Sequence, residues 1–379
     1  MKVIRPAFWR KFRCIGGKCT DNCCVGWEIC IDRETWEKYQ KLPGELGEKL
    51  RREIKIEDGE ISFRMKGERC PFLNEENLCE LICRLGEKSL CEICKEHPRF
   101  YAWMGEWKEA GLGLCCEEAV RLLLENQEKL EFETVWEEGE ETEVDFPWIR
   151  PLWEAREALF TCLQDRRISF SCRMERALLL GERLQECMDW EDQEGFSLEL
   201  KRAKETWRKE EGERVFCEEQ SWLAGYEKIL RILGKMEVMD ERWTEHLERI
   251  RENLPALYRK RKKFEFMEMA WSYEWEHLAV YILFRYFLKG AEDGDVLSKV
   301  RMAAAGCGVV RLLHLDTWVR TGELSLWDRI CNIKAYSKEL EYSEENLEMW
   351  MDFLWGEVEE PKNKNETAVK DLMSDAAVS

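Results

Sequence analysis

Alternation of hydrophobic and polar positions dominates the first third of the chain. Apolar residues alternate with polar ones over 54–65, around an Asp58-Gly59 turn, and this pattern predicts a β-hairpin. A second hairpin is expected over 100–114, centred on Gly105, and a short strand over 27–31. Short helices are expected from the N-cap Asp32 to about Pro43, and over 79–85, 88–96 and 117–126. This third is therefore expected to be a small mixed scaffold.

From residue 147 the pattern changes to a helical period. Glu, Leu, Lys, Arg and Ala dominate, and Pro255 is the one proline between residues 152 and 355. The expected helices lie near 148–165, 171–189, 197–211, 214–235, 240–253, 263–289, 294–320 and 325–356. The most apolar runs, 278–284 and 303–319, are too short or too charged to cross a bilayer, so we expect buried core helices and no membrane partner.

These patterns predict an α+β fold with a small N-terminal domain that contains short hairpins and a cysteine cluster, followed by a mainly α-helical C-terminal domain. We expect the first domain over 1–130 and the helical domain over 147–356. Between them, 131–146 reads as an acidic linker, since 131–145 holds eight acids and no base. The polar tail over 357–379 is expected to be disordered.

The charge balance limits the classes of partner. The net charge is −19, which argues against a nucleic-acid partner. Residues 1–130 are nearly neutral, with 24 acidic and 23 basic side chains, whereas the remainder carries 54 and 36. An acidic surface on the second half could favour a lysine-bearing protein substrate, or it could simply keep the protein in solution.

Cysteines are the strongest chemical signal. Twelve of the eighteen precede residue 117, several beside turn-forming glycines such as Gly16 and Gly17. The first thirteen residues are basic and aromatic and do not resemble a signal peptide, so we expect a cytoplasmic protein with reduced thiols. Clustered thiols in that setting favour a metal or redox centre over a disulfide framework. Isolated cysteines in the helical part are expected to be small buried hydrophobes.

Spacing leaves the metal open. Zinc tetrathiolate sites usually contain two Cys-x₂-Cys pairs, and here only Cys91 and Cys94 have that spacing. A [4Fe–4S] cluster is also held by four thiolates and fits equally well. The adjacent Cys23 and Cys24 are expected to serve different partners. His97 could be a further ligand, but a role in fixing the turn before Pro98 is the better interpretation.

Several motifs together resemble the bacterial flagellin lysine-N-methylase family. The first is C-I-G-G-K-C-T-D-N-C-C-V-G-W-E-I, and it is followed by C-P-F-L at 70–73, S-L-C-E-I-C at 89–94 and L-C-C-E-E-A at 114–119. Weaker matches return at 276–287 and 336–347. The cysteine-rich part is similar to a wider group of zinc- or iron-chelating domains. The sequence departs from the family at Glu117, where Pro is usual, and at Tyr342, where His is frequent.

The resemblance implies an enzyme that methylates lysines of flagellin with S-adenosylmethionine and a cysteine-held iron–sulfur centre. Cys30, Cys83 and Cys115 look additional to the family set. The candidate metal ligands that remain are Cys14, Cys19, Cys23, Cys24, Cys70, Cys79, Cys91, Cys94 and Cys116. No G-x-G-x-x-G turn occurs, so S-adenosylmethionine would bind outside the Rossmann pattern.

Two carboxylates are candidates for the chemistry because they fall in the C-terminal matches. Glu276 begins a strongly apolar helix, and Glu341 lies in the last motif. A partly buried carboxylate could bind the substrate ammonium or accept its proton. The alternative is a structural role, as a helix-end charge or in a pair with Arg285 or Lys338. The competing function for the whole chain is a zinc- or iron-chelating or redox module without catalysis, whose helical half recruits a partner.

Overall fold

The computed structural model describes residues 1–20, 24–25, 28–57, 59–67, 69–138, 146–209 and 219–356. Strands occur only before residue 137 of the described chain, and long helices follow, so the predicted α+β class is confirmed. The strands are β1 (Lys2–Pro6), β2 (Ile54–Glu57), β3 (Glu60–Phe63), β4 (Arg99–Trp103), β5 (Trp107–Leu112) and β6 (Phe132–Trp136). The helices before residue 130 are α1 (Arg33–Lys41), α2 (Gly44–Glu53), α3 (Glu80–Leu85), α4 (Glu92–Glu96) and α5 (Glu117–Glu125).

The later part is a bundle of helices. They are α6 (Ile149–Leu163), α7 (Phe170–Asp189), α8 (Gln193–Lys209), α9 (Glu219–Leu233), α10 (Glu241–Glu268), α11 (Tyr273–Tyr286), α12 (Gly290–Asp293), α13 (Leu297–Thr321), α14 (Leu326–Glu341) and α15 (Glu344–Trp355). Single 3₁₀ turns occur at Ala7–Lys11, Gly16–Lys18, Glu87–Ser89, Met269–Trp271 and Phe287–Lys289.

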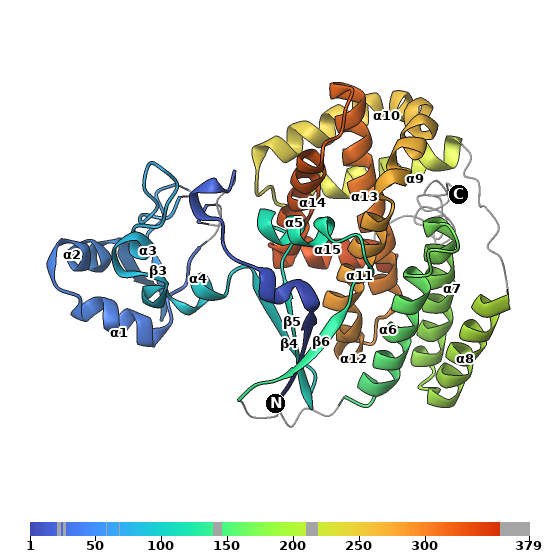
Figure 1. Cartoon of the computed structure of the whole chain (residues 1–379), viewed down its shortest axis with the longest axis horizontal. Helices are drawn as coiled ribbons and strands as arrows, with labels where there is room; N and C mark the ends of the chain where they lie inside the picture. Colours follow the sequence, from blue (N-terminus) through green and yellow to red (C-terminus); the bar gives the residue numbers. More distant parts are fainter. Residues whose placement is uncertain are drawn as a thin grey trace.

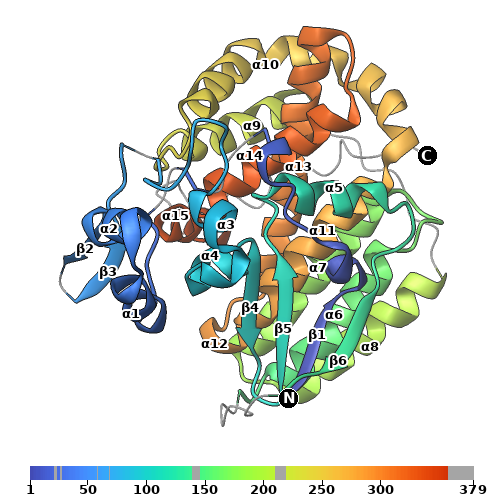
Figure 2. The same ribbon diagram turned by 60° about the vertical axis from the view of Figure 1, so that its left-hand side comes forward.

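The N-terminal strand lies inside the larger sheet. The strand order is β4-β5-β1-β6, with β1 parallel to β5 and antiparallel to β6. The hairpin predicted over 100–114 is confirmed as β4 and β5. Phe132 of β6 stacks on Phe160 of α6 and on Phe284 of α11, with ring centroids 5.3 and 4.5 Å apart. Helices therefore cover one face of the sheet, which lies in front of α6 and α11 in Figure 2.

Two separate hydrophobic clusters divide the molecule. The small lobe, defined here as the described part of residues 28–96, contains α1–α4 and the β2–β3 hairpin and has a cluster that includes Leu50, Phe63 and Phe72. The main body, which comprises the four-stranded sheet, α5 and the later helices, is organised around the second and larger cluster. The small lobe stands apart from the main body (Figure 1).

Local sequence explains most of the small lobe. Asp32 caps α1 as predicted, because its Oδ1 accepts a hydrogen bond from the Thr35 amide at 2.8 Å. Its Oδ2 accepts from the Glu92 amide at 2.8 Å, which ties α1 to α4. The β2–β3 hairpin is confirmed, although it ends at Phe63. The prediction missed α2 altogether, and the expected strand over 27–31 is reduced, in its described part, to a single bridge from Cys30 to Ser62.

Pro255 does not end a helix, which corrects the prediction of separate helices over 240–253 and 263–289. One helix, α10, runs through the proline to Glu268, and α11 begins at Tyr273 after a 3₁₀ turn. Ile250, Leu254 and Leu257 are all buried, so the apolar face continues across the proline. Burial of that face offsets the hydrogen bond that proline cannot donate.

The single helix predicted over 325–356 is two helices. Ser343 begins α15, and its Oγ accepts a hydrogen bond from the Asn346 amide at 3.2 Å. The cap separates α14 from α15 and places Glu341 and Tyr342 at the turn between them. The prediction over 197–211 was four residues late at its start, since α8 begins at Gln193.

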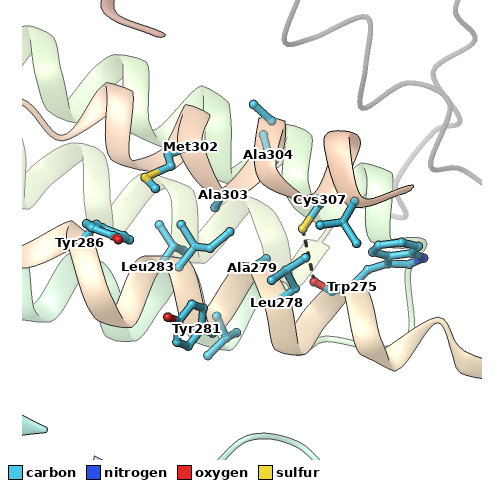
Figure 3. Packing of buried hydrophobic residues seen from close by; sticks show 14 of the residues in the cluster. Trp275, Leu278, Ala279, Tyr281, Leu283, Tyr286, Met302, Ala303, Ala304 and Cys307 are labelled. Atoms are coloured by element: carbon cyan, nitrogen blue, oxygen red, sulfur yellow. Dashed lines mark hydrogen bonds between the residues drawn. The ribbon is translucent and has the colours of Figure 1, made fainter. Parts of the chain in front are cut away.

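The predicted buried helices are confirmed as α11 and α13, which pack directly against each other. Figure 3 shows Met302 and Ala303 of α13 on the side that faces Leu283 of α11. The close approach depends on Gly306, because a Cβ atom there would stand 2.6 Å from the Tyr336 hydroxyl and 2.8 Å from Ile282 Cδ1. No helix in the described ranges is long and apolar enough to cross a membrane.

The predicted linker contains β6, which pairs with β1 over five residues. Residues 139–145 of that linker and the tail over 357–379, predicted to be disordered, lie outside the described residues. The predicted domain boundaries stay predictions.

Candidate metal centre and neighbouring carboxylates

Five of the candidate ligands border the hydrophobic cluster of the small lobe. Cys70 and Cys91 are buried members of the cluster, and Cys24, Cys79 and Cys94 pack against it. The Cys94 thiol donates a hydrogen bond to Cys91, and this bond lowers the pKa of Cys91 and raises that of Cys94. Burial raises the pKa of Cys70 to about 11, and the neighbouring Cys79 and Cys91 add to the shift. These thiols therefore lie close enough to influence each other's ionisation.

Separate segments of the small lobe bring these thiols together. Cys91 is the N-cap of α4, and Cys94 follows in the same short helix. Cys79 is the N-cap of α3 and lies in a bridge with Leu73. The Cys70 amide donates to the Cys24 carbonyl at 2.9 Å, which holds the cysteine loop against the C-P-F-L turn. Short helices and turns thus position the cluster.

A second group of candidate ligands lies beside α5 in the main body. The Cys19 thiol donates to Oε2 of Glu117 at 3.4 Å, and the Thr20 amide and hydroxyl donate to the same oxygen at 3.0 and 2.9 Å. Cys116 directly precedes Glu117, which is buried. Cys14 accepts a hydrogen bond from the Gly16 amide at 3.4 Å. Glu117, the departure from the family, thereby anchors the cysteine loop to α5.

The structure therefore separates the nine candidate ligands. Cys70, Cys79, Cys91 and Cys94 belong to the small lobe, and Cys24 packs against its cluster. Cys19 and Cys116 lie beside α5, Cys14 is placed by its hydrogen bond with the Gly16 amide, and Cys23 lies outside the described residues. Within the described ranges, no three His, Cys, Asp or Glu side chains are arranged to hold one metal ion. The donor chemistry of the small-lobe group still fits, because thiols are the ligands that zinc and iron–sulfur clusters use, and Cys91 and Cys94 already share a hydrogen bond.

His97 connects the small lobe to the main body and faces a tyrosine. Its Nδ1 lies 2.7 Å from the hydroxyl of Tyr342, at the turn between α14 and α15. Burial lowers the pKa of His97 to about 4, so the imidazole is neutral near pH 7. The Cys115 thiol also forms a hydrogen bond with Tyr342, and burial raises the pKa of this thiol. Tyr342, where the family frequently has His, thus contacts residues on both sides of the joint.

Glu341 lies at the centre of a buried polar network beside this joint. Its Oε2 accepts hydrogen bonds from Arg285 Nη1 at 2.7 Å, from Ser337 Oγ at 2.7 Å and from the Tyr281 hydroxyl at 3.0 Å. The Leu114 amide donates to the Tyr281 oxygen at 3.4 Å, which links the network to the end of β5. Oε1 of Glu341 is also buried and has no hydrogen-bond partner in the described structure.

Glu276 is engaged through both carboxylate oxygens. Arg166 donates to them in a bidentate pair at 2.9 and 3.0 Å, and Arg173 Nη1 adds a third bond at 3.0 Å. The Glu276 side chain is fully buried. These contacts hold the start of α11 against α7 and the loop before it, and they leave the carboxylate little capacity for another cation.

The sequence predicts the pair of Glu341 with Arg285 as the structural alternative to a catalytic role, but it does not predict the arginine partners of Glu276. Arg166 and Arg173 lie more than 100 positions from Glu276 in the sequence, so no helical spacing could indicate them. Tyr281 and Ser337 were missed as members of the Glu341 network. Their positions one helical turn from Arg285 and Glu341 were the available signal.

A thiol cluster in a small lobe, joined to a helical body with buried charge networks, defines a two-part α+β protein with a candidate metal centre. The model of the FliB lysine N-methylase C-terminal domain matches residues 156–363, more than half of the chain. The chain therefore belongs to the FliB lysine N-methylase family.

Curated relatives agree with that family. The chain is 30% identical over 135 residues to a lysine-N-methylase of Salmonella typhimurium, a match covering 34% of each protein. It has the same identity over the same length with the flagellar biosynthetic protein FliU of Salmonella muenchen, covering 80% of that relative. The match thus spans about a third of the lysine-N-methylase. No solved structure matches the chain.

Proposed function

We propose that this protein is a cytoplasmic bacterial protein-lysine N-methyltransferase that modifies surface lysines of flagellin, with S-adenosylmethionine as methyl donor. The match of residues 156–363 to the lysine N-methylase family carries this proposal. The flagellar name of one relative supports flagellin as the substrate.

Glu341 is the better of the two candidates for handling the substrate amine. Methyl transfer needs an uncharged lysine amine, so the ammonium must first lose a proton. Oε1 of Glu341 is buried and unengaged in the described structure, whereas both oxygens of Glu276 are occupied by arginines. When bound, S-adenosylmethionine supplies the methyl group on a sulfonium. Glu341 then binds the substrate ammonium and accepts its proton, and Arg285 holds the carboxylate in place.

The thiols of the small lobe are the proposed metal ligands. Cys70, Cys79, Cys91 and Cys94, with Cys24 beside them, would hold a zinc ion or a [4Fe–4S] cluster. Such a centre supplies a soft, thiolate-bound metal and fixes the short segments around it. Metal analysis of anaerobically purified protein distinguishes the two, since a cluster brings iron and acid-labile sulfide and the zinc site does not.

Mass spectrometry of flagellin tests the function directly. Flagellin from cells with the intact gene should carry lysine adducts in steps of about 14 Da, one methyl replacing one hydrogen, and flagellin from a deletion strain should lack them. Complementation with the wild-type gene should restore the adducts. Identical lysine masses in both strains would remove the methylase assignment.

The engagement of both candidate carboxylates in ion pairs favours one alternative, a metal-binding or redox module without catalysis. Calorimetric titration with S-adenosylmethionine separates the two functions. The methyltransferase should bind it, and absence of binding to metal-replete protein would favour the module.

A further inference from the structure

A groove in the main body, far along the chain from the thiols, has the composition of a ligand site. It lies between α6, α7 and the last turns of α8, where α8 packs on the outside of the bundle (Figure 1). Its volume is about 350 Å³, which is the size of a small-molecule site rather than a protein interface. Neither the thiols of the small lobe nor the residues of the Glu341 network line this groove.

Basic side chains dominate this groove. Arg176 of α7 and Lys204 and Arg208 of α8 line it, together with an Arg167 that is held by Asp165 in a bidentate pair at 2.7 and 2.6 Å. Since that pair is neutral, the remaining cations exceed the acids of the groove.

Two of these cations, Lys204 and Arg208, form no ion pair within the described structure, although the chain is rich in acidic residues, with 78 acidic against 59 basic side chains. They are four residues apart on one helix, a spacing at which like charges repel. The repulsion between the two side chains costs free energy, and an anion bound between them would offset that cost.

An aromatic wall accompanies the cations. Trp207 lies between Lys204 and Arg208 in the sequence, is partly buried and lines the same groove. An indole face adds stacking energy for a planar ring. Glu157 lies on the α6 side of the groove and is exposed to solvent, which screens its charge against an incoming anion.

We propose that this groove binds an anionic ligand with a planar ring, of the nucleoside monophosphate class. The phosphate lies between Lys204, Arg208 and Arg176, and the base stacks on Trp207. The net charge of −19 disfavours a nucleic-acid polyanion in the same place. A sulfonium ligand such as S-adenosylmethionine would bring another positive charge to a basic groove. The inference is thus independent of the methyltransferase function.

Calorimetric titration of the full chain with adenosine monophosphate tests the proposal. Wild-type protein should bind this probe more tightly than adenosine or inorganic phosphate, because each of these supplies only half of the contacts. Lys204→Ala, Arg208→Ala and Trp207→Ala should each weaken binding roughly 10- to 100-fold. Lys201→Ala is the matched control, because Lys201 is an exposed lysine on the same helix outside the groove, and it should leave binding unchanged.

Circular dichroism confirms that each variant is folded before titration. Wild-type protein that fails to bind adenosine monophosphate at millimolar concentration would overturn the proposal. Equal binding by the Lys204→Ala and Lys201→Ala variants would overturn it as well. Tight binding of S-adenosylmethionine that Lys204→Ala abolishes would reassign the groove to the methyl donor. Flagellin methylation by the same variants is scored separately, so failure of either proposal leaves the other intact.

Discussion

At the scale of single residues, the ion-pair partners of a buried carboxylate decide whether it remains available for chemistry. Glu276 and Glu341 have similar sequence contexts, but two arginines occupy the first and one arginine holds a single oxygen of the second. The difference arises because Arg166 and Arg173 come from a distant turn and helix. Among the described residues, Oε1 of Glu341 has no hydrogen-bond partner and could contact a substrate amine, whereas arginines occupy both oxygens of Glu276.

The Glu341→Gln variant tests this distinction. We expect its turnover on flagellin to fall about 10²- to 10⁴-fold, the range lost when a general base is removed. Glu276→Gln is the matched control, because it also removes a buried charge from an ion pair and should cost a comparable few kcal/mol of stability, about 3–5. Rates are measured per folded molecule, determined by circular dichroism. Equal loss of turnover in the two variants would contradict the role of Glu341.

Glu339 provides a pH-dependent test of burial. It is 2% exposed, and burial raises its pKa to about 7, although its Oε2 accepts from the Met239 amide at 2.9 Å. Between pH 4.5 and 7 the folded state keeps a proton that the unfolded state releases, so this residue makes stability fall as pH rises through that window. The loss amounts to at most about 3 kcal/mol.

The Glu339→Gln variant should lack that loss. Its free energy of unfolding relative to wild type should therefore rise by up to about 3 kcal/mol between pH 4.5 and pH 7.5, as measured by urea unfolding. Glu344→Gln, at an exposed site, serves as the control. If the free energies of unfolding of Glu339→Gln and wild type differ by the same amount at both pH values, burial does not raise the pKa of Glu339.

At the scale of elements, caps and close contacts set where the helices end and how near they approach. Ser343 caps α15 and so creates the turn that carries Tyr342 to His97. Gly306 lets α13 approach α11 and α14, because a Cβ atom at this position would lie within 3 Å of Ile282 and Tyr336. Single small residues such as Ser343 and Gly306 therefore set the positions of long helices.

Gly306→Ala should destabilise the protein by about 1–3 kcal/mol, despite the better helix propensity of alanine. The added methyl group would meet the Tyr336 hydroxyl and Ile282 Cδ1. Urea unfolding measures the effect. The double variant Gly306→Ala/Tyr336→Phe should recover part of the loss, because it removes the nearest atom. Unchanged or increased stability of Gly306→Ala would show that the helices can separate without cost.

At the scale of the whole molecule, the two separate hydrophobic clusters allow the small lobe and the main body to differ in their free energies of unfolding. The small lobe has its own hydrophobic cluster, bordered by the thiols, while the sheet and the later helices share the larger one. The joint between them includes the contact of His97 with Tyr342. A centre bound to the thiols would therefore stabilise the small lobe far more than the main body.

Replacing Cys91 and Cys94 together by Ser should loosen the small lobe alone. We expect amide hydrogen exchange to accelerate at least 10-fold in α1 and α4, while α11 and α13 keep their protection. Cys83→Ser is the matched control, because Cys83 is exposed and lies outside the cluster. Uniform exchange changes across both parts would show that the two cores unfold as one.

Sequence patterns alone determined the fold class, both hairpins, the Asp32 cap and the buried character of α11 and α13. Those features depend on contacts within a few residues or on a period that burial imposes along one element. They also predict a metal or redox centre at the cysteines of the first third, because clustered thiols in a reducing compartment favour such a centre over disulfides.

Only the tertiary structure decided which groups meet. It separated the thiols into two sets and gave Glu276 its two arginines. It left one oxygen of Glu341 without a hydrogen-bond partner among the described residues, and it gathered the cations of α7 and α8 around Trp207. It also carried α10 through Pro255, because burial of a continuous apolar face outweighed a local rule. Each of these outcomes depends on residues far apart in the chain, and local spacing holds no information about distances that only packing sets.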